Sequence, residues 1–204
     1  GRWYAKDFID YIKRDDSQVL QKMGGGKALH TYPVKKLRVP VDKSQVAKYN
    51  VVSEEEMASV PDYIDWNLGG NYLSKRDLMV VDLIAKNNWE RPIYFSITVG
   101  NSSKSFFWLD QYFQLEGLAY RFTPVLRAKK NQGLDFGEVN VDVMYDNLMN
   151  KFDFGNMELP DVYLDETARR LTYNLRTIYG RLASSLVENG RKEDALKVVD
   201  LAMS

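Results

Sequence analysis

The sequence lacks cysteine altogether, contains a single histidine, and carries no net charge, because 28 lysine and arginine residues balance 28 aspartate and glutamate residues. The absence of cysteine excludes disulfides, cysteine-ligated zinc, iron–sulfur clusters and thiol catalysis. The lone His30 excludes a pair of histidine metal ligands. A zero net charge argues against a nucleic-acid or anionic-membrane surface, although it leaves a local basic patch open. We expect no metal site, no cofactor and no nucleic-acid partner.

Long apolar runs are also missing, and the longest are short stretches such as residues 78–81. A membrane helix needs roughly 20 apolar residues in succession, so none is expected in this chain. With 204 residues, of which 45% are apolar, the chain is long enough to bury a core as one domain with or without a small appendage. Its first residues contain neither a signal peptide nor an initiating methionine, and we expect a fragment of a longer protein.

Apolar spacing in the first third of the chain predicts helices and edge strands. An amphipathic helix is predicted over residues 2–22, where apolar side chains recur at helical intervals. Residues 28–41 alternate as a half-buried strand does, and Pro33 and Pro40 place this strand at a sheet edge because proline cannot donate a ladder hydrogen bond. Two shorter elements are expected next, a helix over residues 43–49 and a strand over residues 63–66.

The clearest helix signal begins at Ser74, which forms a capping-box pattern with Asp77. The helix that follows is apolar over most of its circumference, so we expect it to be covered on more than one side. The pair Asn87-Asn88 predicts its end. Residues 93–99 are rich in β-branched and aromatic residues and predict a central strand. A helix, a tight connection and a buried strand are typical of an α/β sheet.

The second half of the chain predicts further mixed structure followed by a pair of helices. The expected elements are a helix over residues 104–116, a strand over 118–126, a surface loop over 127–140 and a helix over 141–151. A long helical stripe follows in which leucine and isoleucine recur at intervals of three or four, at Leu171, Leu175, Ile178, Leu182 and Leu186.

The sequence Asn189-Gly190 predicts a left-handed helix stop, after which a second helix over residues 193–203 carries an apolar face. That face contains Leu196, Val199 and Met203, and small residues Ala183 and Ala195 permit close packing. This segment resembles the tetratricopeptide helix-turn-helix. We therefore expect an α/β fold, with α+β as the alternative: a body of residues 2–160 containing a small mixed sheet flanked by helices, then a tetratricopeptide-like pair over 161–204. The pair either caps the body or begins a longer array.

One acidic residue stands out as a candidate for binding. Glu116 lies in an aromatic and aliphatic context, where an ionised carboxylate needs a partner, and Arg91 or Arg121 could supply it. A structural ion pair and a ligand pocket edged by aromatic rings and arginine are both open. The sequence assigns no catalytic residue. The candidate binding residues are Trp66, Arg91, Tyr94, Glu116, Tyr120 and Arg121.

Four blocks of the sequence carry a family resemblance, at residues 71–100, 112–125, 139–157 and 162–176. In them the chain resembles the C-terminal soluble portion of the bacterial domain of unknown function family 2723. These are multi-pass membrane proteins similar to glycosyltransferases of the protein O-mannosyltransferase type. The resemblance covers essentially the whole chain from about residue 5.

The resemblance implies a domain on the periplasmic or other extracytoplasmic face of a bacterial membrane. Its partners would be the membrane-embedded part of its own parent chain and a protein or glycan acceptor, while the transfer chemistry would lie in the membrane part. This leads to three hypotheses. The first is a non-catalytic accessory domain for acceptor binding or protein contact. The second is a carbohydrate-active enzyme domain using Glu116 with Arg91 or Arg121, and the third is a scaffold that recruits a partner through its C-terminal helices.

Overall fold

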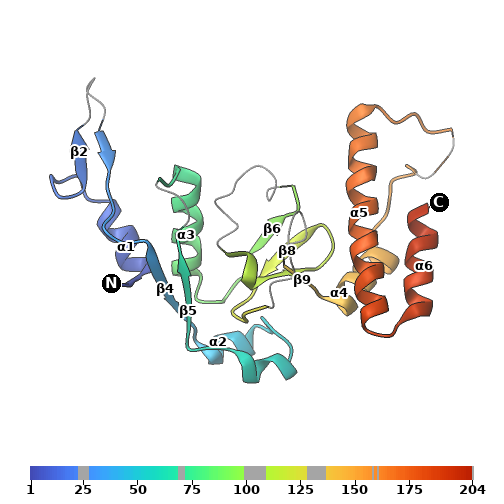
Figure 1. The fold of residues 1–204 in the computed structure, drawn as a ribbon, viewed down its shortest axis with the longest axis horizontal. Coiled ribbons are helices and arrows are strands. Elements are labelled where there is room, and N and C mark those ends of the chain that lie inside the picture. The colour runs from blue at the N-terminus through green and yellow to red at the C-terminus, as the bar shows by residue number, and fades with distance from the viewer. Residues whose placement is uncertain are drawn as a thin grey trace.

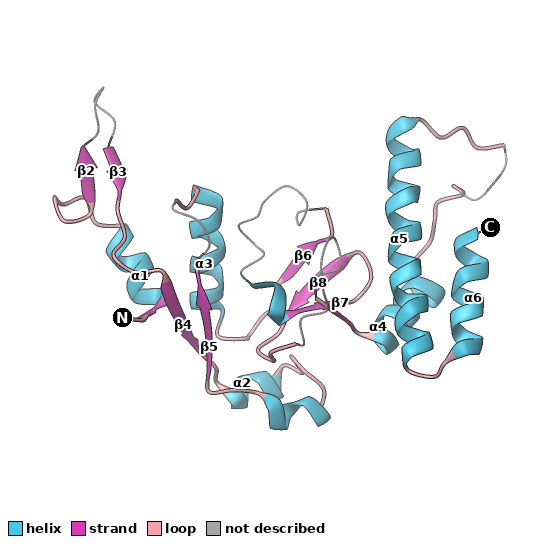
Figure 2. Cartoon of the chain, viewed as in Figure 1, coloured by secondary structure: helices cyan, strands magenta, loops and turns pink. Residues whose placement is uncertain are grey.

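The computed structural model describes residues 1–22, 28–68, 72–98, 109–127, 137–157, 159 and 161–203. The molecule is elongated, with the N-terminal elements at one end, the helical pair at the other and a small sheet between them (Figure 1). Helices and short strands alternate along its length (Figure 2). The strands are β1 (Trp3–Tyr4), β2 (Leu20–Lys22), β3 (Ala28–His30), β4 (Lys36–Pro40), β5 (Tyr63–Asn67), β6 (Tyr94–Ser96), β7 (Phe113–Leu115), β8 (Ala119–Phe122) and β9 (Glu138–Val139). The helices are α1 (Ala5–Ile12), α2 (Lys43–Lys48), η1 (Glu55–Ser59), α3 (Lys75–Asn87), α4 (Val141–Asp146), η3 (Asn147–Lys151), α5 (Glu166–Glu188) and α6 (Lys192–Met203).

The first sheet has the order β1-β4-β5, with β4 parallel to β1 and antiparallel to β5. Strand β4 therefore lies at the centre, and the prediction of an edge strand over residues 28–41 is wrong. Pro40 is tolerated because it is the last residue of β4, and the backbone N–H of Val41 donates to Asp62 O at 2.9 Å instead. Strand β3 belongs to a separate hairpin with β2.

The predicted helix over residues 2–22 is too long. Helix α1 ends at Ile12, and the chain then turns at Asp16, whose side chain accepts from the backbone N–H of Gln18 at 2.9 Å. Such local side-chain bonds compete with helix formation. Beyond the turn the chain forms β2, which pairs with β3 in a hairpin that projects from the body (Figure 1).

Helix α3 begins and ends as predicted. Ser74 and Asp77 form a complete capping box, and Asn88 closes the helix in the left-handed conformation with φ of 45°. The expectation that this helix is covered on more than one side is wrong, because Met79 is 73% exposed and Leu83 is 52% exposed. Val81 and Ile84 are buried in the core, and Leu78, Val80 and Ala85 are partly buried against it.

The second sheet has the order β6-β8-β7-β9, in which β8 is antiparallel to β6 and β7, and β9 is parallel to β7. Strand β6 lies at the edge, so the central position predicted for residues 93–99 is wrong. The predicted helix over residues 104–116 is wrong at its end, which forms strand β7, whereas residues 104–108 lie outside the described residues. The predicted strand over 118–126 is confirmed as β8, although it is shorter.

A tight turn joins β7 to β8. The backbone N–H of Glu116 donates to Ala119 O at 3.1 Å, and Gly117 between them has φ of +127°. A side chain at this position would be strained, and its Cβ would lie 3.1 Å from the ring of Phe152. This turn fixes the end of β7 and with it the position of Glu116.

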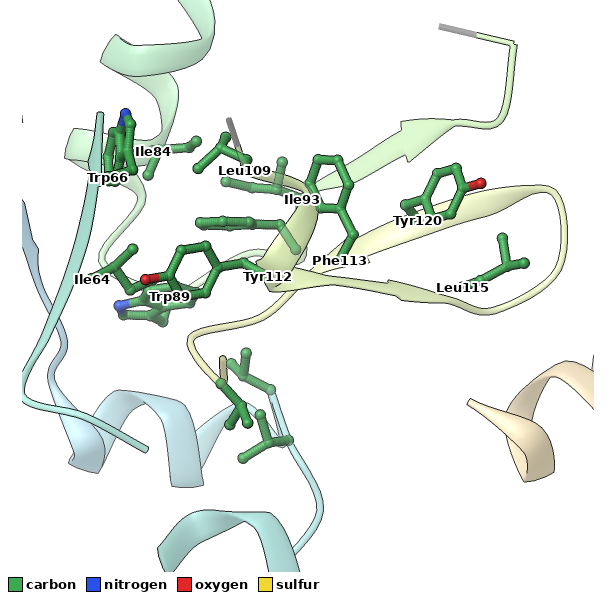
Figure 3. Close-up of a cluster of buried hydrophobic side chains, with 14 of the residues drawn as sticks. Ile64, Trp66, Ile84, Trp89, Ile93, Leu109, Tyr112, Phe113, Leu115 and Tyr120 are labelled. Carbon is green, nitrogen blue, oxygen red and sulfur yellow. The ribbon is translucent and has the colours of Figure 1, made fainter. Parts of the chain in front are cut away.

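One continuous core joins the two sheets and α3. Figure 3 shows Ile64 and Trp66, which belong to the first sheet. They face Ile84, Leu109 and the aromatic rings of the second sheet. The ring of Trp89 stacks on Phe122 with centroids 5.5 Å apart. The burial of large aromatic side chains provides most of the hydrophobic stabilisation here.

The C-terminal helical pair is confirmed, and it contacts the sheet through α4 and β9. Ile178, Leu182 and Leu186 of the predicted stripe are buried, and the hydroxyl of Tyr179 donates to Leu148 O at 2.9 Å. The left-handed stop at Gly190 is also confirmed, with φ of +77°.

The two faces of α6 differ sharply in burial. Ala195 and Val198 are buried, whereas the predicted apolar face of Leu196, Val199 and Met203 is exposed. The predicted helix over residues 141–151 is formed by α4 and a π-helical continuation, η3.

Candidate functional site

A row of polar residues crosses all four strands of the second sheet. Tyr94 of β6 pairs with Arg121 of β8, Arg121 pairs with Gln114 of β7, and Gln114 pairs with Glu138 of β9. Directly paired residues project from the same face of a sheet, so these four side chains share one face.

The neighbouring row gives the opposite face its character. It runs through Phe95, Tyr120, Leu115 and Val139, and all four are aromatic or aliphatic. The second sheet is therefore amphipathic, with one apolar face and one polar face.

Glu116 lies at the end of the polar face in a closed cluster. The hydroxyl of Tyr94 donates to Glu116 Oε2 at 2.9 Å, and Arg121 Nη1 lies 3.5 Å from Glu116 Oε1. The side-chain amide of Asn147 donates to the backbone carbonyl of Glu116 at 2.6 Å. Burial raises the pKa of Tyr94, and the charge of Glu116 raises it further. The carboxylate of Glu116 is thus covered by Tyr94 and Arg121, and its backbone is fixed by Asn147.

Arg121 connects this closed cluster to a second region. Its Nη2 donates to the backbone carbonyl of Asn50 at 3.0 Å, which ties the sheet to residues 47–57, the segment containing the end of α2 and the start of η1. Asn50 has φ of 48°, so the chain turns sharply there and presents its carbonyl to the sheet.

An open cleft of about 860 Å³ separates residues 47–57 from the polar face of the sheet and the start of α4. Gln114, Arg121, Arg127 and Glu138 line its sheet side. Gln114 is only 8% exposed, and its side-chain amide has no hydrogen-bond partner within the described part of the chain. The buried polar atoms of the cleft lining that have no hydrogen-bond partner in the described part of the chain are Nε of Arg121 and Nε of Arg127, and such atoms are uncommon in folded proteins. The amide of Gln114 keeps access to the cleft, where it can exchange hydrogen bonds with a ligand.

Arg127 joins the two walls of the cleft. Its side chain is 6% exposed, and Nη1 contacts the carboxylates of Glu56 and Glu138, the latter at 3.3 Å. Burial acts to raise the pKa of Glu56, but the hydrogen bond and charge of Arg127 outweigh this and lower that pKa. Glu54 and Glu55 stand at the rim without an ion pair to any described residue.

The structure brings three of the six predicted binding residues together, namely Tyr94, Glu116 and Arg121. The partner of Glu116 is Arg121. Arg91 is exposed just before β6 and forms no ion pair with Glu116 among the described residues. Of the six, Arg121 is the residue that lines the cleft.

The other two predicted residues lie elsewhere. Tyr120 projects from the apolar face, and its hydroxyl accepts from Arg181 Nη1 of α5 at 3.0 Å. Trp66 is buried in the first sheet, where it contributes to the core shown in Figure 3.

Sequence reasoning missed the cleft residues Gln114, Arg127, Glu56 and Glu138. The alternation Phe113, Gln114, Leu115 is typical of a strand and would have placed Gln114 on a polar face. It was missed because this stretch was interpreted as a helix. The ion pairs of Arg127 join residues far apart in sequence, and no local pattern indicates them.

Three or more His, Asp or Glu side chains do not gather anywhere in the described ranges in a way that could hold a metal ion. Within those same ranges, none of the helices is both long and apolar enough to cross a bilayer.

Comparison with known protein families gives a match over most of the chain. Neither the curated proteins nor the solved structures contain a match to the chain. The matched region, residues 1–143, includes both sheets and every described residue that lines the cleft, whereas α5 and α6 lie outside it. Residues 1–143 match the family described as TMEM260-associated domain 2, and the chain belongs to this family.

Proposed function

We propose that this chain is a non-catalytic recognition domain of a larger membrane-bound, glycosyltransferase-like protein, and that the cleft binds the polypeptide acceptor. A TMEM260-associated domain is consistent with a domain of a larger membrane protein. The O-mannosyltransferase-like parent and the extracytoplasmic, periplasm-facing location are parts of the proposal, which rest on the sequence resemblance. The membrane-embedded part of the parent would perform the transfer, and this domain would hold the acceptor.

The observation that carries the proposal is the side-chain amide of Gln114, which lines the cleft and has no hydrogen-bond partner among the described residues. A primary amide both donates and accepts hydrogen bonds, as a peptide group does. Extended polypeptide offers such groups at regular intervals, so Gln114 is suited to bind an acceptor backbone.

The charge of the cleft favours a particular acceptor. Five carboxylates and two arginines line it, and Glu54 and Glu55 at the rim are not neutralised by a described residue. Charge complementarity sets specificity and association rate at interfaces. We therefore propose an acceptor segment with lysine or arginine beside the modified residue.

Fluorescence anisotropy tests this proposal with two labelled ten-residue peptides, one containing three lysines and the other three glutamates at the same positions. The basic peptide should bind more tightly, and Gln114→Leu should weaken it by about threefold to tenfold, because one hydrogen bond is lost. Glu54→Gln combined with Glu55→Gln should reduce the preference for the basic peptide. The matched control is Glu90→Gln with Glu193→Gln, which removes two exposed carboxylates outside the cleft. Equal binding of both peptides, or unchanged binding by Gln114→Leu, would contradict the proposal.

In the full-length parent, the same substitution separates binding from chemistry. Gln114→Leu should raise KM for the acceptor and leave kcat unchanged, because a group that only binds substrate contributes equally before and during the chemical step. A large fall in kcat with constant KM would instead assign Gln114 to the reaction.

The exposed apolar face of α6 favours a second candidate function, recruitment of a partner. Leu196 and Val199 are one helical turn apart and both are exposed. Leu196→Ser with Val199→Ser should then abolish co-purification with the separately expressed membrane part of the parent while leaving the domain folded. The carbohydrate-active enzyme alternative is the weaker proposal, because Glu116 lies beneath Tyr94 and Arg121 and does not line the cleft.

A further inference from the structure

A second hollow lies at the N-terminal end of the molecule, between the β2–β3 hairpin and the start of α3. It has a volume of about 640 Å³. Its walls are largely apolar and include Ile12, Tyr32, Leu73 and Leu78. The hydroxyl of Tyr32 is buried and has no hydrogen-bond partner in the described part of the chain. We call this feature the hairpin groove.

Two large side chains at the hairpin groove are exposed to solvent. Tyr72 is 83% exposed and Leu29 is 55% exposed, and both line the groove. Met79 of α3, one helical turn beyond Lys75, is 73% exposed. Exposed apolar side chains gathered at one place indicate a surface that another molecule covers.

The charge of the hairpin groove is opposite to that of the acidic cleft. Lys35 and Lys75 line it, and the described lining contains no aspartate or glutamate. Outside this lining, Asp15 carries an exposed carboxylate 3.9 Å from His30 Nε2 at the base of the hairpin. The cleft is therefore rich in carboxylates, whereas the described lining of the hairpin groove carries two lysines and no carboxylate.

This combination matches the chemistry of a bilayer surface. Lysines near an anionic leaflet are attracted to the lipid phosphates, and tyrosine rings prefer the headgroup region because one end is apolar and the other is polar. A protein partner would have to offer carboxylates to these lysines, whereas an anionic bilayer offers phosphates. The family match is consistent with a domain of a larger membrane protein, which favours the bilayer as the occupant.

We propose that the hairpin groove is a membrane-contacting surface that binds the headgroups of an anionic phospholipid bilayer. Lys35 and Lys75 contact the phosphates, while Leu29 and Tyr72 insert among the headgroups and the first acyl carbons. The contact would fix the orientation of the domain on the bilayer, and it is independent of the acceptor proposed for the cleft.

Vesicle co-sedimentation of the 204-residue chain tests this inference. The chain should partition onto vesicles of phosphatidylcholine with phosphatidylserine more strongly than onto phosphatidylcholine alone, and about 1 M salt should release it. Lys35→Gln with Lys75→Gln should lower the partition coefficient by about 30-fold, given the usual contribution of each lysine near an anionic surface. The matched control is Lys48→Gln with Lys192→Gln, two exposed lysines outside the groove, which should change little. Equal partition onto both vesicles, or equal losses in both double variants, would overturn the proposal.

A second readout uses the absence of cysteine, which allows a single dye to be attached at a chosen site. Tyr72→Cys and Tyr163→Cys form a matched pair, because the two tyrosines are 83% and 85% exposed. A polarity-sensitive dye at position 72 should shift to the blue on anionic vesicles, whereas the dye at position 163 should not. The same shift at both positions, or none at position 72, would refute insertion at the groove.

Discussion

Phe113 and Gln114 are neighbours on β7, and they begin the two contrasting faces of the four-stranded sheet. Both residues are buried, but Phe113 packs against Phe95 and Tyr120 with ring centroids 4.8 and 5.8 Å apart, whereas the amide of Gln114 has no partner within the described ranges. Burial alone does not separate a core residue from a binding residue. What separates them is whether the protein itself supplies the partners of the side chain.

The largest effect should come from the apolar face. Phe113→Ala removes an aromatic ring from the centre of the core and should lower the free energy of unfolding by about 3–5 kcal/mol, through lost burial and the cavity left behind. Gln114→Ala on the polar face should change it by less than about 1 kcal/mol, since no hydrogen bond is lost. Urea unfolding followed by circular dichroism measures both. Similar losses of unfolding free energy for the two variants would contradict the assignment of Phe113 to the core and of Gln114 to the open polar face.

The next effect concerns the helices that cover the end of this sheet. Leu182 is fully buried on α5, and its neighbour Arg181 reaches Tyr120 on the apolar face. Leu182→Ala should cost about 2–5 kcal/mol in unfolding free energy. The control is Leu171→Ala in the same helix, which is half exposed and should cost less than about 0.5 kcal/mol beyond its change in helix propensity. A small loss at Leu182 would mean that α5 is not docked on the body.

The closed cluster of the polar face should show an intermediate effect. Glu116→Ala removes the acceptor of the Tyr94 hydroxyl and the charge partner of Arg121, and it should lower the unfolding free energy by about 1–3 kcal/mol. Glu55→Ala, at the exposed rim of the cleft, should be close to neutral. Thermal and urea unfolding of both variants measure the difference. If Glu116→Ala were as mild as Glu55→Ala, the closed cluster would be better described as part of the open site.

Predictions from local sequence succeeded where a local contact determines the structure. The capping box of Ser74 and Asp77 and the left-handed stop at Gly190 depend on residues a few positions apart. The order of the strands in each sheet does not depend on such local contacts. Strand β4 is central because β1 and β5, which are remote in sequence, pair with its two edges, and β6 is at an edge because its second side has no described partner strand.

The candidate site was only partly predictable for the same reason. The need of Glu116 for an arginine followed from its apolar neighbours, but the choice of Arg121 over Arg91 depends on the pairing of β8 with β6 and β7. Trp66 and Tyr120 are aromatic residues of the core, and their residue type does not distinguish that role from ligand stacking. Gln114 becomes visible once residues 113–115 are known to be a strand.

The smallest effect should be a pH dependence confined to the open half of the polar face. Arg127 lowers the pKa of Glu56 below the ordinary value of 4.5, so the ionised carboxylate stabilises the folded chain above that value. This contribution is lost as the pH falls through the lowered pKa, because protonation of Glu56 weakens the contact that joins residues 47–57 to the sheet. Urea midpoints measured between about pH 6 and about pH 3 should therefore fall more steeply for the natural chain than for Glu56→Gln, which has no proton to bind. Glu54→Gln should retain the steep dependence, since Glu54 forms no ion pair with a described residue. If Glu56→Gln and Glu54→Gln gave the same slope, Arg127 would not connect the two walls of the cleft, and the polar face would lose the feature that divides it into a closed cluster and an open site.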